Sequence, residues 1–182
     1  MAYFLDLLHK SGQNSQFTAY KSGQKPRKKF HCTTWPFIVP ILIFLGIKDS
    51  GGDVAKLALL VHACKGQDFA VLAGSAGFLL PALQVGAQGG ICALANVLPR
   101  EVAQLQQLYE QGQLSEAVSL QHKLLRVNAA VTRGLGVPGL KKAMDLKGYY
   151  GGPVRRPLLP LDSQEESNLR HIFAQDGFAF EN

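Results

Sequence analysis

From residue 41 onward, short continuous apolar runs alternate with stretches of helical periodicity. Residues 41–47 form an unbroken apolar run rich in isoleucine, which is typical of a strand buried on both faces of a parallel sheet. Asp53 is suited to cap a helix, because the apolar residues after it recur with the i, i+3, i+4, i+7 spacing of one helical face. Those residues are Val54, Leu57, Ala58, Val61 and Cys64.

The same order of elements is then repeated twice. A short strand is predicted over residues 69–73 and a helix over residues 76–85. A third strand over residues 90–94 precedes a helix with Pro99 in its first turn, where the missing proline N–H has no helical partner to lose. The order βαβαβα predicts an α/β fold with a parallel sheet and helical crossovers.

Three helices without further strands follow. Apolar residues from Ala117 to Val131 recur at spacings of three and four, which predicts a long amphipathic helix. A shorter helix is expected over residues 140–144. Ser163 and Glu166 have the spacing of a capping box and predict the start of a final helix.

Three parallel strands on their own make an incomplete domain. Their outer edges would be unpaired, and one face of near-continuous apolar strands would be uncovered. We therefore expect either a pairing partner or, preferably, a larger closed sheet to which these strands belong.

Composition supports a globular body and sets the first 45 residues apart. The chain has 182 residues, of which 47% are hydrophobic and 18% charged, and its net charge is +6. Of its 19 Lys and Arg and 13 Asp and Glu, residues 1–45 hold six and one, which leaves 13 and 12 for the rest. Because residues 10–29 are rich in Ser, Gln, Gly and Lys, residues 1–45 are predicted to be a flexible basic tail.

The tail leaves three interpretations open. Residues 26–29, Pro-Arg-Lys-Lys, could contact phosphates or an anionic membrane, or could simply be solvated, as most such runs are. The scarcity of acidic residues suits a transit peptide, although the stretch is rich in Lys rather than Arg. We expect neither nucleic acid nor membrane as a partner.

Two further classes are disfavoured. The longest apolar stretch, residues 35–47, contains Pro36 and Pro40 and is shorter than the roughly 20 residues of a membrane-spanning helix. Cys32, Cys64 and Cys92 are too few and too far apart for a disulfide framework or a zinc site, so no metal is expected.

Lys48 is the main candidate for chemistry. It falls at the carboxyl end of the first predicted strand and is followed by Asp-Ser-Gly-Gly, and the carboxyl ends of parallel strands carry the active sites of α/β folds. Partial desolvation lowers the pKa of a lysine amine and makes it a nucleophile toward ketones. The alternative is a surface lysine just past a strand.

Other candidates are weaker. Glycines at residues 74, 77, 89 and 90 could let a ligand approach the backbone, or could be ordinary turn residues. Residues 149–152, Tyr-Tyr-Gly-Gly, could close over a pocket, although a helix-ending turn is preferred. His62, His122 and His171 are expected to be packing or surface residues of helices.

Several stretches of the body resemble a known family. They are residues 46–53, 71–78, 89–96, 128–133, 139–142 and 148–153, in that order along the chain. They are similar to the C-terminal half of the dihydrodipicolinate synthase and N-acetylneuraminate lyase family. The resemblance implies residues 46–182 to be strands six to eight of a TIM (β/α)8 barrel with a C-terminal helical extension, behind the unmatched residues 1–45.

The resemblance also implies an activity. Lys48 matches the Schiff-base lysine of the family, Ser50 and Gly74 match substrate-contacting positions, and Ile91 matches a residue whose backbone faces the pocket. Within the family, the similarity is greatest to members that cleave 4-hydroxy-2-oxoglutarate to pyruvate and glyoxylate in hydroxyproline breakdown. It implies a mitochondrial class I aldolase, a homo-oligomer such as a tetramer, and no metal or organic cofactor.

Two parts of the family's machinery have no counterpart in this sequence. They are the tyrosine that relays the proton and the Ser/Thr loop that holds the substrate carboxylate, and both would precede residue 46. A whole barrel needs roughly 250 residues. The alternative to an aldolase is therefore a catalytically incomplete, truncated isoform that is inert or binds full-length subunits.

Overall fold

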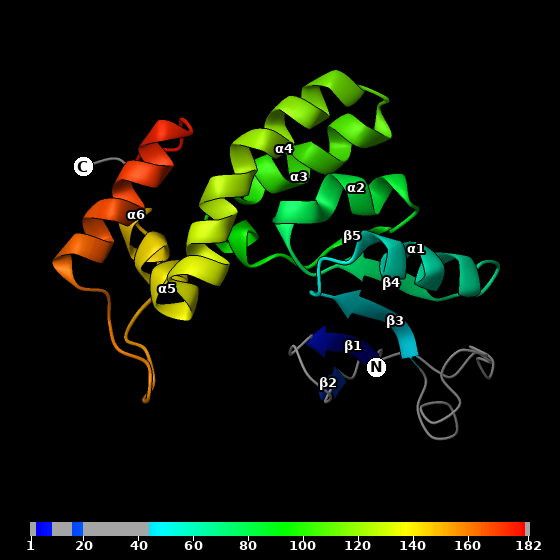
Figure 1. The fold of residues 1–182 in the computed structure, drawn as a ribbon, viewed down its shortest axis with the longest axis horizontal. Coiled ribbons are helices and arrows are strands. Elements are labelled where there is room, and N and C mark those ends of the chain that lie inside the picture. The colour runs from blue at the N-terminus through cyan, green and yellow to red at the C-terminus, as the bar shows by residue number, and fades with distance from the viewer. Residues whose placement is uncertain (1–2, 9–15, 20–43, 181–182) are drawn as a thin grey trace. The chain divides into compact units, whose positions relative to one another are not determined.

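The computed structural model describes residues 3–8, 16–19 and 44–180 (Figure 1). These residues form two compact units. The first comprises the described residues up to Gly74 together with Pro81–Ile91, and the second comprises Ser75–Leu80 together with the described residues from Cys92 onward.

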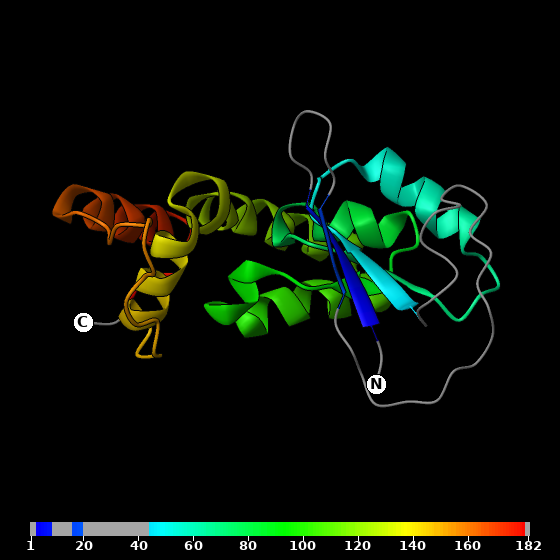
Figure 2. The same ribbon diagram turned by 90° about the horizontal axis from the view of Figure 1, so that it is seen from below.

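The first unit is built on a sheet of five strands in the order β2-β1-β3-β4-β5. Strands β3, β4 and β5 are mutually parallel neighbours, which confirms the predicted parallel sheet (Figures 1 and 2). The strands span Tyr3–Leu8 (β1), Gln16–Ala19 (β2), Phe44–Asp49 (β3), Ala70–Ala73 (β4) and Gly89–Gly90 (β5).

Two strand boundaries differ from the sequence prediction. Strand β3 continues through Lys48 and Asp49, so the lysine lies inside the strand rather than past its end. Strand β5 is only two residues long. It stops there because the Ala95 N–H donates to the Cys92 carbonyl at 3.1 Å and closes a 3₁₀ turn, η2 (Ala93–Asn96), where strand had been predicted.

Two stretches of the predicted flexible tail, Tyr3–Leu8 and Gln16–Ala19, are strands in the structure, and the flexible tail as a whole stays a prediction. Strand β1 pairs in parallel with β3, with Leu5 opposite Ile47, and β2 pairs antiparallel with β1. The edge of β3 that was expected to be unpaired is thereby paired with β1. Its backbone N–H and C=O groups then have hydrogen-bond partners. Residues 26–29 and the other tail residues lie outside the described ranges.

Helix α1 (Val54–Ala63) connects β3 to β4, and Asp53 caps it as predicted. The Asp53 carboxylate accepts a hydrogen bond from the Lys56 N–H at 3.0 Å. The helix predicted over residues 76–85 begins instead with a 3₁₀ turn, η1 (Ala76–Phe78), and continues as α2 (Leu79–Gln84). The Ser75 side chain accepts from the Gly77 N–H and starts that turn.

The second unit is helical. Its long helices are α3 (Pro99–Glu110), α4 (Leu114–Ala129), α5 (Gly136–Leu146) and α6 (Ser163–Gln175), with a π-helical turn, η3 (Ala130–Gly134), between α4 and α5. Pro99 occupies the first turn of α3, as predicted. The apolar faces supply fully buried side chains; among them are Leu94, Leu105, Leu124, Val127, Leu169 and Phe173.

Two buried amides on α4 bind the segment that follows β4. Gln121 donates to the Ala76 carbonyl at 2.8 Å and accepts from the Leu80 N–H at 3.0 Å. Asn128 donates to the Ser75 hydroxyl at 3.0 Å. These bonds satisfy polar groups that burial would otherwise leave unpaired.

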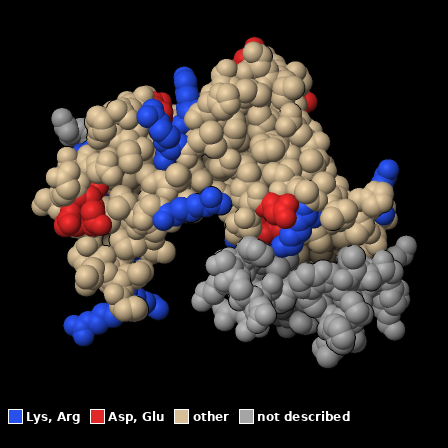
Figure 3. Space-filling view, in the orientation of Figure 1, with Lys and Arg blue, Asp and Glu red and all other residues tan. Residues whose placement is uncertain are grey.

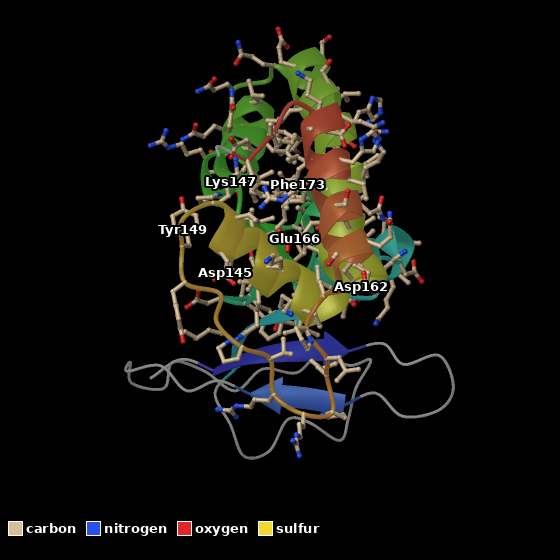
Figure 4. All side chains as sticks on the ribbon, turned by 90° about the vertical axis from the view of Figure 1, so that its left-hand side faces the viewer. Asp145, Lys147, Tyr149, Asp162, Glu166 and Phe173 are labelled. Carbon is tan, nitrogen blue, oxygen red and sulfur yellow. The ribbon has the colours of Figure 1, made fainter. Side chains whose placement is uncertain are left out.

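The cap of α6 lies one residue before the predicted one. Asp162 accepts from the Glu165 N–H at 2.7 Å, and Glu165 accepts from the Asp162 N–H at 3.0 Å, so these two residues form the capping box. Glu166 instead pairs with Lys142 of α5 at 2.6 Å and with Arg170 at 3.1 Å (Figure 4). The predicted pair of Ser163 and Glu166 is therefore wrong.

Charged side chains are spread thinly over one face of the described residues. On the face shown in Figure 3, Lys, Arg, Asp and Glu stand in small separate groups among uncharged residues. No helix of the described residues has the length and hydrophobicity needed to cross a membrane.

Candidate active site

Lys48 lies near the carboxyl end of β3, half-buried, and its Nζ donates a hydrogen bond to the Ser50 Oγ at 3.1 Å. The strand ends one residue later, and the chain turns through Ser50 and Gly51 toward α1. Lys48 thus lies within the strand and not beyond it, and its chemical role stays a prediction. An amine and a hydroxyl meet at the edge of the sheet where α/β folds carry their chemistry.

Gly74 joins the same cluster from the neighbouring strand. It directly follows β4, and its N–H donates to the Asp49 carbonyl at 2.7 Å. A Cβ at this position would overlap the Ser50 Oγ and stand 2.7 Å from the Lys48 Cδ. The residue must therefore lack a side chain for Lys48 and Ser50 to lie where they do.

Asp49 is a residue that the sequence analysis missed. Its side chain is 1% exposed, one carboxylate oxygen accepts from the Gly51 N–H at 2.7 Å, and the other lies 3.1 Å from the Lys56 ammonium. The alternation of a strand would have placed Asp49 on the face opposite Lys48. That signal was hidden because the predicted strand ended before both residues.

The structure places the remaining candidates as follows. Ile91 follows β5 and is 49% exposed, and its N–H extends the ladder by donating to the Ala73 carbonyl at 2.8 Å. Its expected contact with substrate stays a prediction. Gly89 and Gly90 form the short strand β5, and Gly77 lies in η1.

Tyr149 and Tyr150 belong to the turn that ends α5, which was the preferred interpretation of residues 149–152. The Tyr149 N–H donates to the Met144 carbonyl at 2.9 Å, and the Gly151 N–H donates to the Asp145 carboxylate at 2.7 Å (Figure 4). The exposed fractions of Tyr149 and Tyr150 are 52% and 83%.

The three histidines discussed above lie exposed on helices, as expected. Within the part of the chain that the structure describes, no three His, Cys, Asp or Glu side chains are grouped so that they could hold a metal ion. The chemistry available to the cluster is that of its amine and hydroxyl. A lysine amine can condense with a ketone, and the hydroxyl can bind an oxygen of the same molecule.

Comparison with known proteins finds one family model that matches the chain. It is the dihydrodipicolinate synthetase family, and it matches residues 39–176. A protein of Halobacterium salinarum described as an uncharacterized DapA-like lyase is 35% identical over 158 residues, which is 87% of this chain and 51% of the relative. The chain thus spans about half the length of the curated relatives it matches.

Solved structures show the same partial correspondence. The dihydrodipicolinate synthase DapA-2 of Bacillus anthracis is 31% identical with a TM-score of 0.69, over 74% of this chain and 46% of that protein. The Escherichia coli protein YagE, a family protein solved in complex with pyruvate, is 27% identical with a TM-score of 0.67, over 74% and 47% of the two chains. The described fold is consistent with part of such a barrel.

Proposed function

We propose that this chain, which belongs to the dihydrodipicolinate synthetase family, carries the Schiff-base lysine of a class I aldolase-type lyase. The observation that supports this most directly is the cluster at the carboxyl ends of β3 and β4, where the Lys48 Nζ lies 3.1 Å from the Ser50 Oγ beside Gly74. A related protein described as a lyase and another solved with pyruvate agree with this chemistry.

The proposed reaction begins with attack of the Lys48 amine on C2 of a 2-oxo acid. Loss of water from the carbinolamine gives an iminium ion at C2, which accepts the electron pair of the C3–C4 bond while the C4 hydroxyl gives up its proton to a base or to water. Cleavage of that bond releases an aldehyde and leaves a pyruvate enamine, which is protonated and hydrolysed to pyruvate and free lysine. Ser50 binds a substrate oxygen, and Gly74 leaves room for the substrate.

The proposed substrate is 4-hydroxy-2-oxoglutarate, with pyruvate and glyoxylate as products. This choice is supported by the similarity of the sequence stretches around Lys48, Gly74 and residues 89–96 to aldolases of hydroxyproline breakdown. A mitochondrial location and assembly into a homo-oligomer belong to the same proposal.

A second candidate function is binding to full-length subunits of the family without catalysis. The chain covers 51% of its Halobacterium relative, and the stretches that resemble the family lack the proton-relay tyrosine and the carboxylate-binding loop. Without the relay, a factor of about 10² to 10⁴ in rate would be lost. In this second candidate, the chain binds full-length subunits and does not complete the reaction itself.

Borohydride trapping with pyruvate tests the main proposal. The 182-residue chain is incubated with pyruvate and sodium borohydride, digested, and mapped by mass spectrometry. We expect the reduced adduct at Lys48 and its loss in Lys48→Met. Lys65→Met, which changes an exposed lysine of the same unit, should trap normally. An unmodified Lys48 in a folded sample, or adducts spread over surface lysines, would overturn the proposal.

Two further measurements test the proposed substrate and the binding to full-length subunits. Release of glyoxylate from 4-hydroxy-2-oxoglutarate, compared with turnover of 2-oxo acids that lack the 4-hydroxyl, tests the substrate. Co-purification of the chain with a full-length aldolase of the family tests the second function, and a drop in the activity of that aldolase on mixing is the expected sign of it. Absence of association under native conditions would count against it.

A further inference from the structure

Asp49 lies between Lys48 and Ser50 in the sequence, and its side chain is on the face of β3 opposite that of Lys48. Its carboxylate is 1% exposed, and buried carboxylates occur where they are paired and hydrogen-bonded. One of its oxygens is hydrogen-bonded, whereas the other, Oδ2, makes no hydrogen bond and has only an ion-pair contact. One accepts from the Gly51 N–H at 2.7 Å, and the other pairs with the Lys56 ammonium at 3.1 Å.

The bond to Gly51 fixes the turn that carries Ser50. Asp49 ends β3, and its side chain accepts a hydrogen bond from the Gly51 N–H two residues later, as in an Asx turn. The Ser50 Oγ lies in this turn and accepts from the Lys48 Nζ at 3.1 Å. The direction of the hydroxyl therefore depends on the Asp49 carboxylate.

The backbone of Asp49 fixes the third member of the cluster. Its carbonyl accepts from the Gly74 N–H at 2.7 Å, one step beyond the last paired residues of β3 and β4. The ion pair ties the same residue to the first turn of α1, which contains Lys56. One buried residue thus connects Lys48, Ser50 and Gly74 to the helix behind them.

We infer that Asp49, held by Lys56, is a positioning residue for imine formation at Lys48. It orients the amine and the Ser50 hydroxyl without touching the substrate. The inference rests on the proposed function, since it assigns a role in the same reaction. An error in placing reacting groups of about 1 Å can cost on the order of 100-fold in rate, so loss of the Asp49 contacts should act mainly on the rate of trapping.

The test compares Asp49→Asn, Asp49→Ala, Lys56→Met and Lys56→Arg with the unchanged chain. For each, the rate constant of borohydride trapping is measured against pyruvate concentration, and the trapped fraction gives the amount of competent protein. We expect Asp49→Ala to lower the maximal rate constant about 10- to 100-fold. Lys56→Met should lower it less, and Lys56→Arg should restore it because the cation is kept.

A purely structural role predicts a different result. Loss of folded protein lowers the trapped fraction and leaves the rate constant of the remaining molecules unchanged. Asp176→Asn is the matched control, because the Asp176 side chain is 9% exposed and pairs with Arg126 at 2.6 Å in the second unit. It should leave the trapping rate constant unchanged. An unchanged rate constant in Asp49→Asn and Asp49→Ala would overturn the inference.

Hydrogen exchange separates this inference from the proposed function. The amides of Gly51 and Gly74 are followed in the unchanged chain and in Asp49→Ala. Failure of the unchanged chain to trap pyruvate would overturn the proposed function. In that case, loss of Gly51 protection in Asp49→Ala still supports the positioning role, and unaltered Gly51 protection overturns it. The Gly74 amide is the internal reference, because its acceptor is the Asp49 backbone carbonyl, which the variant keeps.

Discussion

The two units use their charged side chains differently. In the first, the Asp49 carboxylate is 1% exposed and its partner Lys56 is 30% exposed, so the pair lies beneath the strand that carries Lys48. In the second, Arg126 is 59% exposed and binds Asp176, and Lys142 and Arg170 bind a partly exposed Glu166. The ion pairs of the second unit join helices at the surface.

Burial decides what such a pair can do. An exposed pair is screened by water and contributes roughly 0 to 1 kcal/mol. Breaking a buried pair leaves an uncompensated charge and costs more, and its geometry is held more rigidly. The comparison predicts that changes in the second unit alter stability alone, whereas changes around Lys48 alter reactivity as well.

The largest expected effect on stability is at Phe173. Its ring is fully buried in α6 and stacks on Phe180 with centroids 4.7 Å apart. Phe173→Ala should lower the free energy of unfolding by about 3 to 5 kcal/mol, measured by urea unfolding. The rate constant of pyruvate trapping per folded molecule should stay the same. A slower rate would contradict the prediction that changes in the second unit alter stability alone. Leu159→Ala, at 77% exposure, is the control and should stay within about 0.5 kcal/mol.

The next largest effect is at Gly74, where the rate of trapping should change more than the stability. Gly74→Ala places a Cβ against Ser50 and 2.7 Å from the Lys48 Cδ. Trapping should slow by about 100-fold, with a stability loss of about 1 to 3 kcal/mol from overpacking. Gly66→Ala is the control, because its φ of +77° strains the backbone in open space. It should cost about 1 kcal/mol of stability and trap at the normal rate.

The capping box of α6 gives a smaller effect. Asp162→Ala removes the acceptor of the Glu165 N–H, found at 2.7 Å, and should lower the free energy of unfolding by about 0.5 to 2 kcal/mol. Thermal unfolding measures the loss, and exchange of the Glu165 amide locates it. Ser163→Ala should change stability little. A larger loss of stability in Ser163→Ala than in Asp162→Ala would favour the capping box of Ser163 and Glu166 that the sequence predicted.

The smallest effect is the pH dependence of Glu166. The hydrogen bond from Lys142, supported by Arg170, holds the pKa of the Glu166 carboxyl below its ordinary 4.5. Since the folded value is the lower one, this stabilisation is present above about pH 4.5 and is lost as the pH falls through that region toward the folded pKa. Glu166→Gln should remove at most about 1 kcal/mol at neutral pH.

The measurement for Glu166 is urea unfolding between pH 3 and pH 7. The difference between the unchanged chain and Glu166→Gln should shrink toward the acid end of that range. A difference that stays constant with pH would show that the ion pairs contribute nothing. Trapping by Lys48 at neutral pH should be the same in both proteins.

Local signals in the sequence predicted much of the fold. Asp53 and Pro99 were placed correctly because a side-chain cap and a proline in the first turn depend on a few neighbouring residues. The last helix was shifted because Asp162 and Ser163 are both good caps, and Glu165 and Glu166 both have the required spacing. The contact of Glu166 with Lys142, far away in sequence, decides between them.

The site was predicted less completely for a related reason. Lys48 and Gly74 were candidates from their positions at strand ends, the resemblance to a family added Ser50, and the structure brings the three together. Asp49 was missed because a carboxylate followed by Ser-Gly-Gly looks like part of an exposed turn. Its burial depends on two more residues of strand and on a cation in the next helix, which local patterns do not show.

The hydrogen bond between the Gly74 N–H and the Asp49 carbonyl joins two residues that lie close together in the sequence as well as in space. Every residue of the cluster comes from one unbroken stretch, residues 48–74, which runs from the end of β3 through α1 to the residue after β4. A sequence change outside this stretch therefore leaves the lysine and the groups around it adjacent along the chain. The proposed nucleophile, its hydroxyl partner and its positioning carboxylate are thus carried by one strand–helix–strand segment.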